Sequence, residues 1–415
     1  MGRTPTRMLL SLLVLLAPGA EACLWDADTL RHEMKGLPGV TEAIVGAFER
    51  LPDAFYEERL LIADERLATG DAHLGTYDDA AVACDRLGRH AVALDWLAKK
   101  RAALDELPEF YLEHEYRYHA NLGTVLAHRW LSGGADRDDM ADLRAARDEI
   151  ARAIEINPDA HFGREVVQLA VLDWLLAPAD VLAEVMSKPQ YDVRIPAVSQ
   201  DRRPSLAPFL ISRAGRERTL AGLVGMISMG AAWESVDVMA ALQELTRRRG
   251  DNSVAYIAHL RVLELLEQGR MPLRLDVWEV DEPDDPVVAF RAATEASTWT
   301  VPHLEKVDWE FRRWRSEADA YHQDLEEWAE AKLTRGIHPD RIDDPSARAA
   351  FWATAPQPSG MANHGSWGPR LGLGLVLVIV LIAVGLTGIV AFVIGQLAGR
   401  AFERQSTSSS RTIRA

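Results

Sequence analysis

An uncharged run of 25 residues, Leu371 to Gly395, constrains this chain more than any other feature. At about 1.5 Å of rise per residue, a helix of that length is longer than the roughly 30 Å hydrocarbon core of a bilayer. We therefore expect a transmembrane helix over 371–395, between a large domain and a tail of residues 396–415. The basic flank of a span stays in the cytoplasm, and the tail contains Arg400, Arg404, Arg411 and Arg414.

The first 22 residues predict export across that membrane. Arg3 and Arg7 precede a ten-residue apolar stretch, which is too short to span a bilayer, and the small residues Ala20 and Ala22 close the segment. This order is typical of a cleaved signal peptide, residues 1–22. An uncleaved anchor and a lipoprotein acylated at Cys23 are the alternatives. We expect a bacterial single-pass protein of the cytoplasmic membrane, with its N-terminal domain periplasmic or extracellular and its C-terminus cytoplasmic.

The exported part is acidic. The whole chain carries a net charge of −16, and because residues 1–22 contribute +1 and the tail contributes +3, the part between them carries −20. Such a domain repels nucleic acid, which is therefore not an expected partner. The two cysteines, Cys23 and Cys84, either form a disulfide in an oxidising compartment or remain free thiols.

From about residue 38 to 335, apolar residues recur at steps of three and four, with Gly or Pro punctuating the pattern. This predicts stacked antiparallel helices and an all-α fold. Two stretches within 74–160 have more specific spacing. The first combines Tyr77, Ala81 and Cys84 with Gly88 at a turn and then Ala93 and Leu97. The second combines Leu122, Gly123 and Leu126 with Ala146, Ile150, Ala153 and Pro158.

These spacings resemble the tetratricopeptide (TPR) repeat family, in which small residues let two helices approach closely and large residues fill the space between pairs. The resemblance implies a helical-hairpin solenoid whose first helices line a groove that binds a protein or peptide. Lys100 departs from the family pattern, which has alanine there. The residues of this chain at the family's groove positions are Asp78, Asp85, Arg86, Arg117 and His128. The alternative is that these are ordinary solvated residues.

The same patterns divide the chain into segments. We expect an N-terminal helical segment (23–73), TPR-like repeats (74–187), a Pro-rich loop and connection (188–217), degenerate hairpins (218–275), C-terminal capping helices (276–352) and a stalk (353–370). In the capping region an apolar stripe predicts one helix of about 30 residues. This helix either covers the end of the array or makes a homotypic coiled coil. The stripe consists of Leu304, Val307, Phe311, Trp314, Ala318, Tyr321, Leu325 and Trp328.

No sequence motif in the exported part predicts catalysis. His114 and His119 are five residues apart, and on a helix they diverge by about 140°, so they do not form a zincin pair. The segment GMISMG, 225–230, lacks the spacing of a nucleophile elbow. The acidic segments 135–142 and 276–285 lack the EF-hand spacing and are expected to be solvated loops. We expect no catalytic residue, cofactor or metal site, with surface or core positions for His114, His119, His128 and His161.

The transmembrane run carries a small residue at every fourth position, which favours close packing of two spanning helices and hence a homodimer. The strip consists of Ala383, Thr387, Ala391, Gly395 and Gly399. Together with the repeats, it predicts a non-enzymatic, membrane-anchored scaffold that binds a protein or peptide on the extracytoplasmic side. The alternatives are a structural envelope protein without a dedicated soluble partner and an enzyme with its site near loop 188–208.

Overall fold

A computed structural model describes residues 26–28, 31, 36–108, 111–158, 164–182, 206–230, 232–274 and 304–358. All regular structure within these ranges is helical, which confirms the predicted all-α class. The predicted signal peptide, Cys23, the acidic segment 276–285, the transmembrane helix with its small-residue strip and the tail lie outside the described residues. Among the helices inside the described ranges, none has the length and apolar character needed to span a membrane.

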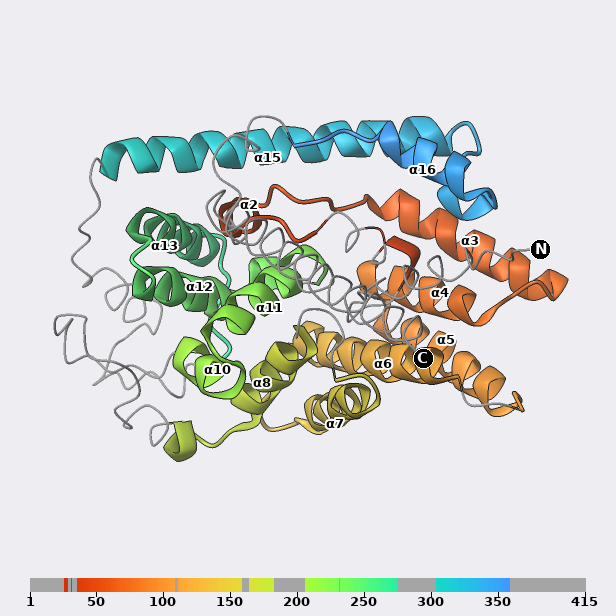
Figure 1. The fold of residues 1–415 in the computed structure, drawn as a ribbon, viewed down its shortest axis with the longest axis horizontal. Helices are drawn as coiled ribbons and strands as arrows, with labels where there is room; N and C mark the ends of the chain where they lie inside the picture. Colours follow the sequence, from red (N-terminus) through yellow and green to blue (C-terminus); the bar gives the residue numbers. More distant parts are fainter. Residues whose placement is uncertain are drawn as a thin grey trace, which may run out of the picture. The chain divides into compact units, whose positions relative to one another are not determined.

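The helices follow one another with short connections in most of the described chain (Figure 1). In chain order they are α2 (Val40–Val45), α3 (Asp53–Thr69), α4 (Leu74–Arg86), α5 (His90–Asp105), α6 (Leu112–Ser132), α7 (Ala141–Ile156), α8 (Arg164–Leu176), α10 (Leu206–Ala214), α11 (Arg216–Ser228), α12 (Val236–Arg248), α13 (Asn252–Glu267), α15 (Leu304–Leu333) and α16 (Pro345–Ala353). Two short 3-10 helices, η2 (Ala232–Glu234) and η4 (Pro339–Arg341), complete the described set.

The helices α4 and α5 pack against each other as the first predicted hairpin requires. Gly88 in the connection has a φ of +71°, a conformation that glycine adopts without steric cost. The small residues of the motif are fully buried where the two helices meet, and large apolar side chains surround them. This cluster contains Ala81, Cys84, Ala93, Trp96 and Leu97.

The helices α6 and α7 form the second hairpin, and their approach depends on Gly123. A Cβ atom added at Gly123 would lie 2.8 Å from Cγ1 of Ile150 and 2.9 Å from the carbonyl oxygen of Ala146. The acidic connection between the two helices is folded back onto α6, because Nε1 of Trp130 donates hydrogen bonds to the carbonyl oxygens of Asp136 and Asp139, at 2.9 and 3.1 Å.

The helix α10 lies within the interval 188–217, for which the sequence predicts a Pro-rich loop and connection. Its residues Leu206, Phe209 and Leu210 are buried, so the apolar face of this short helix outweighs the local prolines. Beyond it, α11 packs against α8 at Gly222, where an added Cβ would lie 2.5 Å from Cγ2 of Val167. The helices α12 and α13 form a further pair.

The predicted long helix is α15, which begins at Leu304 and has 30 residues. Its apolar stripe is buried against α2, α3 and α13, which lie beside it in Figure 1. Six of the eight predicted stripe residues are buried: Val307, Phe311, Trp314, Ala318, Tyr321 and Leu325. The stripe therefore covers helices of its own chain, and little of it is exposed for a homotypic coiled coil.

Buried ion pairs join the beginning of the described chain to its end. The guanidinium of Arg59, on α3, is 1% exposed and lies 2.9 Å from a carboxylate oxygen of Asp26 and 2.8 Å from one of Asp28. Its Nε donates to Oδ2 of Asp340, in η4, at 2.7 Å. Asp340 comes 281 positions after Arg59, so this cluster fixes two distant parts of the chain to each other.

Candidate functional site

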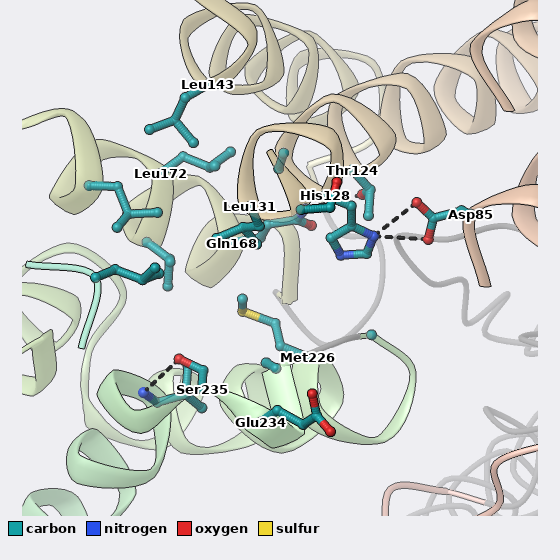
Figure 2. Close-up of a pocket in the computed structure, with 18 of the residues that line it drawn as sticks. Asp85, Thr124, His128, Leu131, Leu143, Gln168, Leu172, Met226, Glu234 and Ser235 are labelled. Carbon is teal, nitrogen blue, oxygen red and sulfur yellow. Dashed lines mark hydrogen bonds and ion pairs between the residues drawn. The ribbon is translucent and has the colours of Figure 1, made fainter. Parts of the chain in front are cut away.

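A pocket of about 650 Å³ lies between α4, α6 and α8 on one side and α11, η2, α12 and residues 269–273 on the other. Figure 2 shows its lining side chains. The helices α4, α6 and α8 supply twelve lining residues, whereas α5 supplies His90 and α7 supplies Leu143. The pocket thus lies on the face that the repeat pattern predicts to be the inner one.

Most of the pocket wall is apolar. Aliphatic side chains and thioethers from several helices form it, and these are Leu131, Leu143, Val171, Leu172, Leu175, Met226, Met229, Val238, Met271 and Leu273. Polar groups lie near the C-terminal end of α4 and on α6 and α8, where Nε2 of Gln168 donates to Oγ1 of Thr124 at 3.1 Å. The opposite wall adds Glu234, Ser235 and Arg270. A volume of this size with an apolar wall and few polar groups is typical of ligand-binding pockets.

The polar end of the pocket is built around Asp85, which is 6% exposed. Nδ1 of His128 lies 2.9 Å from Oδ2 and 3.0 Å from Oδ1 of this carboxylate. Figure 2 shows the imidazole of His128 between Asp85 and the interior of the pocket. His90, the first residue of α5, places Nε2 3.7 Å from Oδ1 of Asp85. The turn at Gly88 is what returns the chain from Asp85 to His90 within five residues.

The environment of Asp85 favours its ionised form. Burial alone would raise the pKa of this carboxyl group, but the charge and hydrogen bond of His128, together with the charges of Arg86 and His90, more than offset that effect. The pKa of Asp85 therefore lies below its ordinary value of 3.8. The carboxylate is kept as an anion that two imidazoles face, and one ligand atom from each of Asp85, His90 and His128 lies within 4.8 Å of the other two.

Arg86 also lines the pocket, but its guanidinium is directed at the opposite wall. Nη1 donates to the carbonyl oxygen of Gly230 at 3.2 Å, and Nη2 donates to the carbonyl oxygen of Met229. These bonds join α4 to the end of α11. Arg86 therefore holds the two walls together rather than presenting a charge to a ligand.

Three of the five predicted groove residues line this pocket, and Asp78 and Arg117 do not. Nζ of Lys100 lies 2.7 Å from both carboxylate oxygens of Asp78, and Nδ2 of Asn121 donates to Oδ1 at 2.9 Å. Asp78 is 1% exposed and is paired inside the helix packing, away from the pocket lining. Arg117 forms an ion pair with Glu113 one turn before it on α6.

Sequence reasoning missed Lys100 as the partner of Asp78 and His90 as the partner of Asp85. A signal was present for the first, because a lysine at a position that the family pattern fills with buried alanine needs a buried anion. The other histidines have separate surroundings: Nδ1 of His119 lies 2.6 Å from Glu149, away from His114. Ser228 lies in α11, where its hydroxyl donates to the carbonyl oxygen of Val224.

The chain was compared with known proteins at three levels. Its sequence matches no protein-family model and no curated protein, and its fold matches no solved structure. Neither a family nor an activity is transferred from a relative.

Proposed function

We propose that the chain is a non-enzymatic, membrane-anchored binding protein whose TPR-like helical domain holds a short segment of a partner protein on the outer face of a cytoplasmic membrane. The observation that carries this proposal is the pocket itself. Side chains of α4, α6 and α8 form much of its wall. We infer that these are the first helices of TPR-like pairs, which line the binding surface in repeat proteins.

The form of the pocket limits the kind of partner. The helices α11 and α12 close the side that an open solenoid would leave free, which reduces a continuous groove to a pocket of about 650 Å³. This volume suits a few side chains rather than an extended peptide along the whole array. The apolar wall favours a segment with one or two aliphatic or aromatic anchors, because such side chains supply most of the binding energy at interfaces.

Charge favours a neutral or basic partner. The part of the chain between the predicted signal peptide and the tail carries −20, so an acidic protein approaches it against long-range repulsion. At the pocket itself the polar end combines the anion of Asp85 with the imidazole of His128. Mixed polar groups of this kind fix the orientation of a segment whose apolar anchors fill the remainder.

A peptide-selection experiment tests the proposal. The full chain in detergent micelles is used to select binders from a random peptide library, and the selected peptides are then measured against Leu172→Trp. Leu172 is 3% exposed and lines the pocket, so the larger ring fills it. We expect at least a tenfold loss of peptide affinity in this variant.

The matched control is Leu61→Trp on α3, where the leucine is 57% exposed and outside the pocket. This variant should bind the selected peptides like the unmodified chain. Both variants are first checked for unchanged helical circular dichroism. Failure to select any peptide whose binding depends on Leu172 would contradict the proposal and favour a purely structural role in the envelope.

A further inference from the structure

We infer that Asp85, His90 and His128 form a binding site for a divalent transition-metal ion, with Zn²⁺ as the expected occupant, at the polar end of the pocket. The inference goes beyond the proposed function, because binding of a protein segment in the pocket needs no metal. It also revises the expectation from sequence that the histidines occupy ordinary surface or core positions.

The three side chains are of the kinds that bind zinc. Two imidazoles and one carboxylate are ligands that Zn²⁺ prefers, and three protein ligands with one open position are typical of zinc sites that bind a water molecule or a substrate. Each donor comes from a different helix, α4, α5 or α6. The three helices belong to two packed pairs, so the donors are held by the core of the domain and not by an exposed loop.

The distances from the carboxylate of Asp85 to the two imidazoles are close to those of a tetrahedral zinc site. Oδ1 of Asp85 lies 3.0 Å from Nδ1 of His128 and 3.7 Å from Nε2 of His90. Tetrahedral ligands at bond lengths of about 2.0–2.1 Å lie about 3.3–3.4 Å from one another. The observed separations bracket this value. All three ligand atoms, including those of the two imidazoles, lie within 4.8 Å of one another.

The surroundings of the three residues leave room for a metal ion and a further ligand. Asp85 is 6% exposed and lies at the wall of a pocket with room for a fourth ligand. The two neighbouring arginines in the chain are directed elsewhere, Arg86 to the carbonyl oxygens of Met229 and Gly230 and Arg89 to the carboxylate of Glu57. The imidazole of His128 lies within hydrogen-bond distance of the carboxylate, and imidazoles bind metals when neutral. The guanidinium of Arg86 is bonded to the opposite wall, although its charge still acts on Asp85.

Metal titration of the full chain tests the inference. The protein in detergent micelles is treated with a chelator, exchanged into metal-free buffer and titrated with Zn²⁺ by calorimetry and with Co²⁺ by visible absorption. We expect one equivalent of Zn²⁺ to bind and Co²⁺ to give the absorption bands of a four-coordinate site. His90→Ala and His128→Ala should each lower the affinity for Zn²⁺ at least tenfold, since each removes one of three ligands.

His119→Ala is the matched control, because His119 lies on α6 like His128 and also faces a carboxylate, that of Glu149. This variant should bind Zn²⁺ like the unmodified chain. If an alanine variant loses its helical circular dichroism, His90→Gln and His128→Gln are used instead, with the zinc-induced rise in unfolding temperature as the readout. The inference is overturned if the unmodified chain binds no equivalent of Zn²⁺, or if the substitutions at His90 and His128 bind as tightly as His119→Ala.

Discussion

Two buried carboxylates on α4, Asp78 and Asp85, lie two helical turns apart and have different partners. Asp78 lies inside the first helix pair, where the ammonium group of Lys100 and the amide of Asn121 satisfy it. Asp85 lies at the wall of the pocket, where imidazoles face it. Both residues occupy positions that the repeat pattern assigns to a binding groove, and one of them is at a pocket.

The difference shows that the partner of a buried carboxylate determines its role in the protein. Lys100 has no other charged partner within hydrogen-bond distance among the described contacts, and it is completely buried, so it and Asp78 depend on each other. Burial lowers the pKa of Lys100, and the nearby charge of Asp78 partly offsets that effect. The ammonium group of Lys100 makes Asp78 part of the core, whereas Asp85 faces an imidazole, a group that can bind a proton or a metal ion.

The largest expected effect comes from breaking the core pair. Lys100→Met removes the cation and leaves the carboxylate of Asp78 buried with Asn121 alone, which should lower the free energy of unfolding by about 3–5 kcal/mol. Urea unfolding of the full chain in detergent micelles, followed by circular dichroism, measures the loss. The double variant Lys100→Met with Asp78→Leu should recover most of it, because no charge then remains buried. A loss below about 1 kcal/mol in the single variant would show that Asp78 is reached by water.

A third buried carboxylate, Asp237 on α12, sharpens the comparison because its partner is a backbone N–H group. The nitrogen of Leu273 donates to Oδ2 at 2.8 Å. Burial raises the pKa of Asp237 from 3.8 to about 6, despite this hydrogen bond. The folded chain therefore binds this proton more tightly than the unfolded chain, and stability decreases as the pH rises from about 4 to about 6.

Asp237→Asn removes that titration and keeps an oxygen acceptor for Leu273. The free energy of unfolding of the unmodified chain should fall by about 2–3 kcal/mol relative to the variant between pH 4 and pH 7. Urea unfolding at both pH values provides the comparison, and taking the difference from the variant cancels the other titrating groups. Parallel pH profiles for the two proteins would show that Asp237 is solvated in the folded chain.

Both clusters depend on the position of α6, which supplies Asn121 to one and His128 to the other. Gly123→Ala should push α6 away from α7, because the new Cβ would lie within 3 Å of Ile150 and of the backbone of Ala146. We expect a loss of about 2 kcal/mol in the free energy of unfolding, in the range of overpacked cores. Gly133→Ala, at the end of the same helix, is the control, since its nearest contact would be 3.3 Å. Equal stability of the two variants would contradict the close approach at Gly123.

The smallest expected effect comes from breaking the pair at the pocket. His128→Ala should lower the free energy of unfolding by about 1.5 kcal/mol, the contribution of a hydrogen bond to a charged group, because water in the pocket can solvate Asp85. Urea unfolding under the conditions used for Lys100→Met gives the comparison. A loss as large as that of Lys100→Met would mean that Asp85 is as dry as Asp78 and that the pocket does not reach it.

The sequence predicted those helices and helix contacts that follow from a regular spacing of apolar or small residues. Steps of three and four along α15 identified its buried residues, and the small residues at Gly123 and Ala146 identified the contact of α6 with α7. The helix α10 was not predicted, because its few turns follow a segment rich in proline and its burial depends on distant helices. Short elements of this kind receive their stability from packing rather than from their own sequence.

The site was predictable in part for a related reason. Periodicity places Asp78 and Asp85 on the same face of α4, and nothing in their local sequence distinguishes them. The distinction comes from Lys100 and His90 on α5, whose side chains meet these acids through tertiary contact. The opposite wall, with Met226 and residues 269–273, comes from chain more than 90 residues away and could not be assigned from the repeats.

The buried ion pairs of Arg59 have a consequence for the order in which the chain folds. Its partner Asp340 is made 281 residues later, and α15, which covers α2 and α3, is also synthesised near the end of the described chain. A chain is synthesised from its N-terminus, so the bond of Arg59 to Asp340 and the packing of α15 on α2 and α3 form only after nearly all of the described domain has been synthesised. Folding to the native state is then a late, long-range event, slower than the local pairing of α4 with α5 or α6 with α7.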